Sequence, residues 1–199
     1  MTQDFINMVN NGVKRSTDNW GTGMILQHPI TKKILLAKRT DTGEYGTPGG
    51  KVEYQESPKD GVLRETLEES NIPVKDMICY GNNLHVAPNG KNWVDFLFYS
   101  DSFDDSNIQN QETEMEEFNW YDVDEALNLN LFPPSRTGLE LAVKAGLLNN
   151  TADTSNYISY IDCPVSATAV SDSYPCQYSY CEPQQTYEGK LESPWIYWD

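Results

Sequence analysis

Short apolar runs separated by polar, turn-rich stretches predict a fold in which strands and helices alternate along the chain. Four of these runs predict strands: Trp20–Leu26, Ile34–Arg39, Val74–Tyr80 and Trp93–Tyr99. The second run is apolar enough to be buried on both of its faces. The fourth alternates less than a half-exposed strand would, which favours a central position in the sheet.

Helix signals are clearest between residues 57 and 73. Ser57 stands where an N-cap is expected, and Pro58 takes the first helical position. Asn71 can adopt the left-handed conformation of a C-cap, and Pro73 prevents the helix from continuing. Weaker patterns predict three further helices: one within residues 1–19, one beginning at Val123–Leu127, and one capped by Ser135 that runs to about Gly146.

The helix after Ser57 carries three glutamates on one face. At about 100° per residue, Glu68 and Glu69 fall on either side of Glu65, all within an arc of roughly 100°. Like charges at these spacings destabilise an isolated helix by about 0.2–0.5 kcal/mol per pair. Either the face is simply solvated, or a cation neutralises it. Oxygen ligands at one focus suit Mg²⁺, with Mn²⁺ as a second candidate.

The full stretch around this helix is more informative than the three carboxylates alone. Residues 50–72 read GKVEYQESPKDGVLRETLEESNI, with the spacing Gly-x5-Glu-x7-Arg-Glu-x2-Glu-Glu. This resembles the Nudix box, the motif of Nudix hydrolases. The sequence departs from the family at Asn71, where Gly is usual, and at Thr66, where an aliphatic residue is common. Asn is the next-best residue for a left-handed cap, so both departures are mild.

The resemblance covers about residues 18–147 and implies an α/β fold: a Nudix-type α/β/α sandwich with a mixed central sheet. It divides the chain into an N-terminal segment (residues 1–17), a Nudix domain (18–148), and a C-terminal extension rich in Ser, Tyr and Pro (149–199). The extension holds too many aromatic residues for a plain linker, and its structure is unknown at this point. It could cap a pocket or mediate dimerisation, so a homodimer is left open.

The resemblance also implies metal ligands. These would be Glu65, Glu68 and Glu69, the carbonyl oxygen of Gly50, and an additional glutamate in the acidic run before the last strand, either Glu112 or Glu114.

Further roles follow from the same resemblance. Arg64 would orient the carboxylates of the box, and Glu56 would brace the loop or serve a second metal ion. Glu68, Glu69 or Glu114 would take part in catalysis, and the choice of general base stays open. Arg39 and Lys51 would contact substrate phosphates.

The activity implied is Mg²⁺-dependent cleavage of a nucleoside diphosphate linked to a group X, giving a nucleoside monophosphate and phosphate-X. Nucleoside triphosphates and ADP-ribose are both candidates, and Pro88 stands near the position of a proline seen in ADP-ribose-hydrolysing members. Trp20, Phe96 and Trp120 are candidates for the pocket wall or for the core. The alternative is a nucleotide sensor or protein-interaction module without turnover, which the intact box carboxylates disfavour.

Charge and composition narrow the partners. The 199 residues contain 30 acidic and 14 basic side chains, a formal net charge of −16. Such a balance argues against a long nucleic acid as partner, while the small nucleotide substrate is what the Nudix resemblance implies. There is no apolar run of membrane-spanning length and no leader pattern, so we expect a cytoplasmic protein that does not enter a membrane. The four cysteines include no C-x-x-C pair, which argues against a zinc site.

Overall fold

The computed structural model describes residues 3–15, 18–87, 90–109, 114–149 and 176–179. Its elements are, in chain order, α1 (Gln3–Asn11), β1 (Trp20–Leu26), β2 (Ile34–Lys38), β3 (Tyr45–Gly46), α2 (Pro58–Ser70), β4 (Val74–Val86), β5 (Asn92–Phe103), β6 (Asn119–Tyr121), α3 (Val123–Asn128), α4 (Pro133–Lys144) and β7 (Cys176–Ser179).

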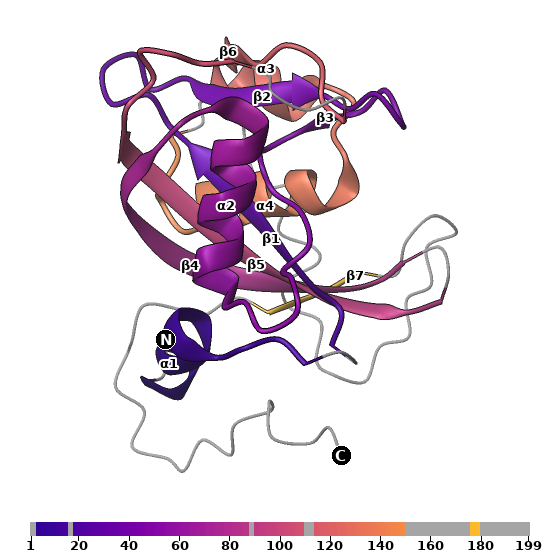
Figure 1. The fold of residues 1–199 in the computed structure, drawn as a ribbon. Coiled ribbons are helices and arrows are strands. Elements are labelled where there is room, and N and C mark those ends of the chain that lie inside the picture. Colours follow the sequence, from indigo (N-terminus) through magenta and orange to yellow (C-terminus); the bar gives the residue numbers. More distant parts are fainter. Residues whose placement is uncertain (1–2, 16–17, 88–89, 110–113, 150–175, 180–199) are drawn as a thin grey trace.

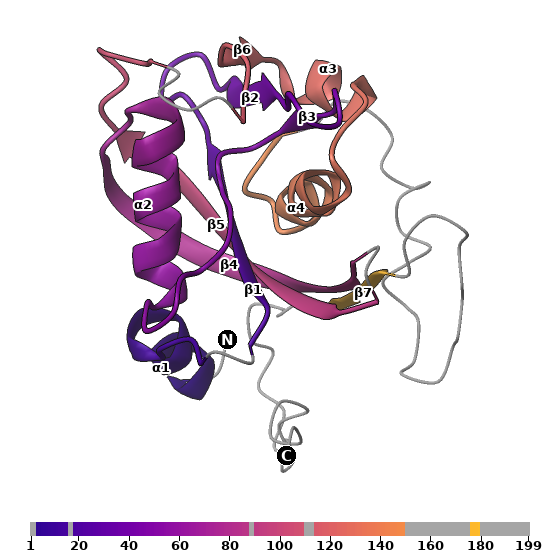
Figure 2. The same ribbon diagram turned by 45° about the vertical axis from the view of Figure 1, so that its right-hand side comes forward.

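Two sheets form the centre of the fold (Figure 1). The larger has the strand order β1-β5-β4-β7, and the smaller has the order β3-β2-β6. β1 runs parallel to β5, whereas the β4–β5 and β4–β7 pairs are antiparallel, so the larger sheet is mixed. Figure 2 shows α2 and α4 on opposite sides of this sheet. The predicted α/β/α sandwich with a mixed sheet is confirmed.

Alternating side chains build a separate core on each face of the sheets. On β2, Ile34 and Leu36 join the cluster that packs against α4, while Leu35 and Ala37 join the cluster beneath α2. The predicted burial of this strand on both faces is therefore confirmed. On β1, Ile25 belongs to the α4 side. The other apolar residues of that strand face α2, and the α4 side is left with two glycines at positions 21 and 23.

β4 and β5 are longer than the sequence predicted, because they form one antiparallel ribbon. The ribbon pairs Val74 with Phe103 at one end and Val86 with Asn92 at the other. The polar residues Asn82, Asn83 and His85 interrupt the apolar pattern, but the ladder hydrogen bonds continue through them. Phe103, four residues beyond the predicted end of this strand at Tyr99, accordingly still belongs to β5.

Ser135 was predicted to cap the last helix, and this prediction is wrong. α4 begins two residues earlier, at Pro133, and the cap residue Phe132 makes no side-chain cap hydrogen bond. Proline is favourable in the first turn because its missing N–H has no helical partner there. The Ser135 hydroxyl instead accepts a hydrogen bond from the backbone N–H of Thr47 (3.1 Å).

The N-terminal segment packs against the rest of the fold. Val9 of α1 is buried in the core beneath α2. The Lys14 ammonium donates to the carbonyl oxygen of Val52 (2.6 Å), and Gln55 N–H donates to the carbonyl oxygen of Lys14. Residues of the N-terminal segment thus help to fix the loop before α2.

Beyond residue 149, the part of the C-terminal extension that the structure describes is β7, which pairs with residues 82–85 of β4. No helix in the described part of the chain is long and apolar enough to cross a membrane.

Candidate active site

The helix α2 begins and ends as its sequence predicts. The Ser57 hydroxyl accepts a hydrogen bond from the Asp60 N–H (3.1 Å), which satisfies one of the free amides of the first turn. Asn71 has a left-handed backbone (φ 58°), and its N–H donates to the carbonyl oxygen of Leu67. With both ends fixed, the helix holds its glutamates on the side that faces the loop of residues 46–51.

Arg64 gathers the charged groups of the box around one guanidinium. It donates to both carboxylate oxygens of Glu56 (2.9 and 3.0 Å), to Glu65 (3.0 Å), to Glu68 (2.9 Å) and to the carbonyl oxygen of Lys51 (3.0 Å). These contacts, with Glu56 the largest, raise the pKa of Arg64. Burial alone would raise the pKa of Glu56, but hydrogen bonds from Arg64 and from the Glu53 N–H lower it.

The loop of residues 46–51 runs alongside β1 and depends on glycine. Thr22 N–H donates to the Gly50 carbonyl oxygen, and Met24 N–H donates to the Pro48 carbonyl oxygen, both at 2.8 Å. Gly49 has a φ of 150°, and a Cβ there would lie 2.2 Å from the carbonyl oxygen of Thr22. Only glycine allows this approach.

Both helices that cover the sheet hold the same loop. From α2, the buried Glu69 carboxylate accepts a hydrogen bond from Gly49 N–H (2.8 Å). From α4, Ser135 accepts one from Thr47 N–H. The loop backbone is therefore fixed from two directions.

The box carboxylates are the candidate ligands of a metal ion. Across residues 3–15, 18–87, 90–109, 114–149 and 176–179, no three Asp, Glu, His or Cys side chains stand close enough together to hold a metal ion. The carboxylates are directed at Arg64 and the loop instead. The donor set still fits a hard divalent cation, because it is all oxygen. A Cβ on Gly50 would lie 2.6–2.7 Å from the Glu65 carboxylate. Residue 50 therefore has no side chain at the point where the Glu65 carboxylate approaches the backbone. Glu65, Glu68 and Glu69 would hold the ion.

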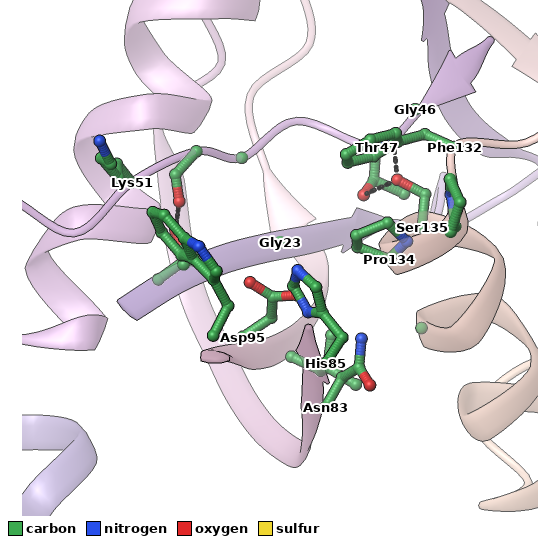
Figure 3. Close-up of a pocket in the computed structure, with 18 of the residues that line it drawn as sticks. Gly23, Gly46, Thr47, Lys51, Asn83, His85, Asp95, Phe132, Pro134 and Ser135 are labelled. Carbon is green, nitrogen blue, oxygen red and sulfur yellow. Dashed lines mark hydrogen bonds and ion pairs between the residues drawn. The ribbon is translucent and has the colours of Figure 1, made fainter. Parts of the chain in front are cut away.

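A cavity of about 500 Å³ opens on the other side of the loop (Figure 3). Gly49, Gly50 and Lys51 form part of its wall. The remaining wall comes from the α4-facing side of the sheet, from the turn after β2 and from the start of α4, and it includes Gly21, Gly23, Arg39, Tyr80, Asn83, His85, Trp93, Asp95, Leu97, Phe132, Pro134 and Ser135. A largely apolar cavity with a few convergent polar groups is typical of a small-molecule site.

A family model described as the NUDIX domain matches residues 19–141. The chain belongs to the Nudix hydrolase family. It is 32% identical over 135 residues to the uncharacterized Nudix hydrolase YvcI of Bacillus subtilis (strain 168), a match that covers 65% of this chain and 83% of that relative. It is 34% identical over 103 residues to the NAD-capped RNA hydrolase NudC of Actinobacillus succinogenes, covering 48% of this chain and 38% of that relative.

Solved structures give the same assignment. A MutT Nudix hydrolase from Burkholderia pseudomallei superposes with a TM-score of 0.56 at 28% identity, covering 63% of this chain and 98% of the other. The Nudix domain of Shewanella oneidensis NrtR superposes with a TM-score of 0.55 at 20% identity, covering 72% of this chain and 98% of the other, and shows a shared fold. This Nudix protein is therefore a hydrolase of phosphoric anhydride bonds in nucleotide-like substrates.

The two cations predicted to meet phosphates both line the cavity of the Nudix domain. Arg39 donates to both carboxylate oxygens of Asp41 (3.0 and 2.8 Å) and lies over the Phe132 ring, 4.6 Å from its centroid. Burial lowers the pKa of Arg39, but Asp41, Glu69 and Glu114 outweigh it, so the net change is upward. Lys51 is exposed, with its ammonium 5.4 Å from the Trp93 ring centroid.

Of the other predicted residues, Glu114 contacts the turn that follows β2, and two lie outside the described chain. The carbonyl oxygen of Glu114 accepts from Thr40 N–H (2.9 Å), and its carboxylate acts on Arg39 through its charge. Glu112 and Pro88 lie outside the described residues.

The three aromatic candidates for the pocket wall belong to the core. Trp20 packs edge-on against Phe96, and Trp120 stacks on Phe103. The aromatic residues of the wall are instead Tyr80, Trp93 and Phe132. On β5 the alternation of side chains could have given this answer, since Trp93 and Phe96 are three positions apart and so face opposite ways.

Proposed function

We propose that this protein is a divalent-metal-dependent pyrophosphohydrolase that uses Mg²⁺ and cleaves a nucleoside diphosphate linked to a group X. The products would be a nucleoside monophosphate and phosphate-X. The observation that carries the proposal is the intact box on one face of α2: Arg64 orients the carboxylates of Glu65 and Glu68, and the Gly49 N–H holds that of Glu69.

Each residue has a chemical task in this proposal. When bound, the cation would polarise phosphoryl oxygens and lower the pKa of a bound water. Arg64 keeps the carboxylates of Glu65 and Glu68 in place through charge-assisted hydrogen bonds. Arg39 and Lys51 stand on the cavity side of the loop, where their charges would offset phosphate charge.

A substrate panel tests the proposal. Phosphate release is measured with and without added phosphatase for nucleoside triphosphates, ADP-ribose, dinucleoside polyphosphates, NADH and capped RNA. The same panel is run after EDTA treatment with Mg²⁺, Mn²⁺ or Ca²⁺ added back. We expect turnover of one class that requires Mg²⁺ or Mn²⁺.

Two variants and one control identify the residues. Glu68→Gln and Glu69→Gln should each lower turnover by orders of magnitude while the folded state persists, because glutamine keeps a hydrogen-bond acceptor but loses the charge. Glu117→Gln, at an exposed position outside the box, should behave as wild type. Wild-type rates in both box variants would exclude these glutamates as metal ligands. Nucleotide binding without turnover in Mg²⁺ would favour a sensor instead.

A further inference from the structure

Three polar side chains sit together in the wall of the cavity, and the hydrolysis assigns no task to them. Asn83 and His85 come from β4, and Asp95 comes from β5. Asn83 pairs directly with Asp95 across the two strands, and Asp95 pairs with Gly21 of β1. Figure 3 shows the three side chains next to one another below Gly23. Asn83 is fully buried and Asp95 is 8% exposed.

Several atoms of this group have no hydrogen-bond partner among the described residues. They are Asn83 Nδ2, Asn83 Oδ1, His85 Nδ1 and Asp95 Oδ2. His85 Nδ1 and Asp95 Oδ2 nevertheless face each other at the ion-pair distance of 3.0 Å, so the Asn83 amide is the part of the group with neither a hydrogen-bond nor an ion-pair partner among the described residues. Leaving buried polar atoms unpaired is costly, so such groups are explained by a water or a ligand that pairs them. By contrast, the Tyr80 hydroxyl in the same wall donates to the Gly138 carbonyl oxygen (2.9 Å).

The neighbouring backbone is shaped around this group. A Cβ on Gly21 would lie 2.2 Å from Asp95 Oδ1, so the carboxylate occupies its place only because residue 21 is glycine. The same point lies 3.6 Å from the Gly50 carbonyl oxygen. The polar group therefore adjoins the loop that faces the box carboxylates. One ligand can therefore contact both the polar group and this loop.

The hydrogen-bonding chemistry of these side chains indicates which part of a ligand they would contact. An ionised carboxylate only accepts hydrogen bonds, whereas an asparagine amide both donates and accepts. Around them the wall is apolar and partly flat, with Tyr80, Trp93 and Leu97. A flat heterocycle with N–H donors and ring or carbonyl acceptors on one edge matches this wall, and nucleobases have that edge.

We infer that Asn83 and Asp95 select the nucleobase of the substrate. Asp95 accepts an N–H of the base, Asn83 pairs with a neighbouring donor or acceptor, and His85 holds the Asp95 carboxylate in position. This inference rests on the proposed function, because it takes the ligand to be a nucleotide.

Binding measured without turnover tests the inference. The full chain is titrated calorimetrically with AMP, GMP, CMP and UMP in EDTA, so that neither metal nor catalysis contributes. We expect the wild type to separate the four bases. Asn83→Leu should lower the affinity for the monophosphate with the preferred base by about tenfold or more. Asp95→Asn keeps the shape but replaces an acceptor by a donor–acceptor amide, so it should change the order of preference.

Asn82→Leu is the matched control. Asn82 precedes Asn83 on the same strand and is equally buried, but it does not line the cavity. Thermal unfolding of each variant shows whether it is folded. If a leucine variant does not fold, the test rests on Asp95→Asn, which keeps the shape of the side chain. The control should keep the wild-type order of bases.

Two results would overturn the inference. One is equal affinity of the wild type for all four monophosphates, or an order that survives both cavity variants. The other is a loss of affinity when the 2′-hydroxyl is removed from the monophosphate, whichever base it carries. In that case these residues would contact the ribose rather than the base. Either result leaves the proposed hydrolysis standing if the substrate panel shows Mg²⁺-dependent turnover. A base preference without turnover would reject only the hydrolysis.

Discussion

Replacing Gly50 by alanine tests the contact between the loop and the box carboxylates. The new Cβ would lie 2.6 Å from Glu65 Cδ and 2.7 Å from each carboxylate oxygen. Folded proteins do not tolerate such contacts, so the Glu65 side chain has to move. Gly50 is not among the described residues with positive φ, so alanine adds no backbone strain there. The perturbation is therefore confined to the carboxylate.

The expected loss of stability follows from what Glu65 gives up. Its hydrogen bond from Arg64 Nη1 measures 3.0 Å, and bonds to charged groups contribute about 1.5–3 kcal/mol. The Arg64 side chain is 24% exposed and that of Glu65 15% exposed, so solvent screening favours the lower end, about 1–2 kcal/mol. For a chain of this size, that corresponds to a decrease in Tm of about 2–8 °C.

Activity should suffer more than stability. A misplacement of about 1 Å at a reacting centre can cost about a hundredfold in rate, and Glu65 is a proposed metal ligand. We expect kcat/KM of Gly50→Ala to fall by about that factor, measured by phosphate release in Mg²⁺. The matched control is Gly81→Ala, because a Cβ at Gly81 meets nothing within 4 Å.

A compensating change sharpens this test. Glu65→Asp shortens the side chain by one methylene and withdraws the carboxylate from the Gly50 Cα. The double variant should therefore recover part of the stability that Gly50→Ala loses. A Gly50→Ala protein with wild-type Tm and turnover would show that Glu65 does not occupy this position, and the argument would fail.

Two further perturbations address the box and the C-terminal extension. Glu56 has a lowered pKa in the folded protein, so it adds stability above its ordinary pKa of 4.5 and loses that contribution as the pH falls through the folded value. Urea unfolding between pH 7 and pH 3 should therefore show a shallower acid decline for Glu56→Gln than for wild type, and identical slopes would contradict the assignment. Truncation after Asn149 removes β7, the partner of β4 next to Asn83, but leaves the box and the cavity residues in place. We expect KM to rise with kcat nearly unchanged, whereas a lost kcat in a folded protein would make the extension part of the catalytic machinery.

The sequence predicts the box helix well because its determinants are local. The cap at Ser57, the left-handed Asn71 and the spacing from Glu65 to Glu69 all lie within a few turns of one helix. Helix geometry alone then fixes which side chains share a face. The same applies to β2, whose continuous apolar run specifies burial on both faces.

The polar group of the cavity could not be found in this way. Asn83 and Asp95 are adjacent only because β4 and β5 pair in one particular antiparallel register. Their place beside the loop also requires that β5 lie next to β1, opposite Gly21. Ser135 was misassigned for a related reason, since its hydroxyl bonds to Thr47, 88 positions earlier in the chain. Register and helix docking are tertiary properties, and a local pattern does not contain them.

The crowding of glutamates on α2 is resolved within the chain itself. Three like charges on one helix face call for a cation, and in the folded protein that cation is Arg64, which bonds Glu65 and Glu68 and also ties Glu56 to the loop. Glu69 is satisfied separately by the Gly49 N–H. These partners all belong to the chain, so each of the three carboxylates has a hydrogen-bond donor within the protein. If Glu65 and Glu68 hold a divalent ion, Arg64 would be both the group that orients their carboxylates and a competitor for their oxygens.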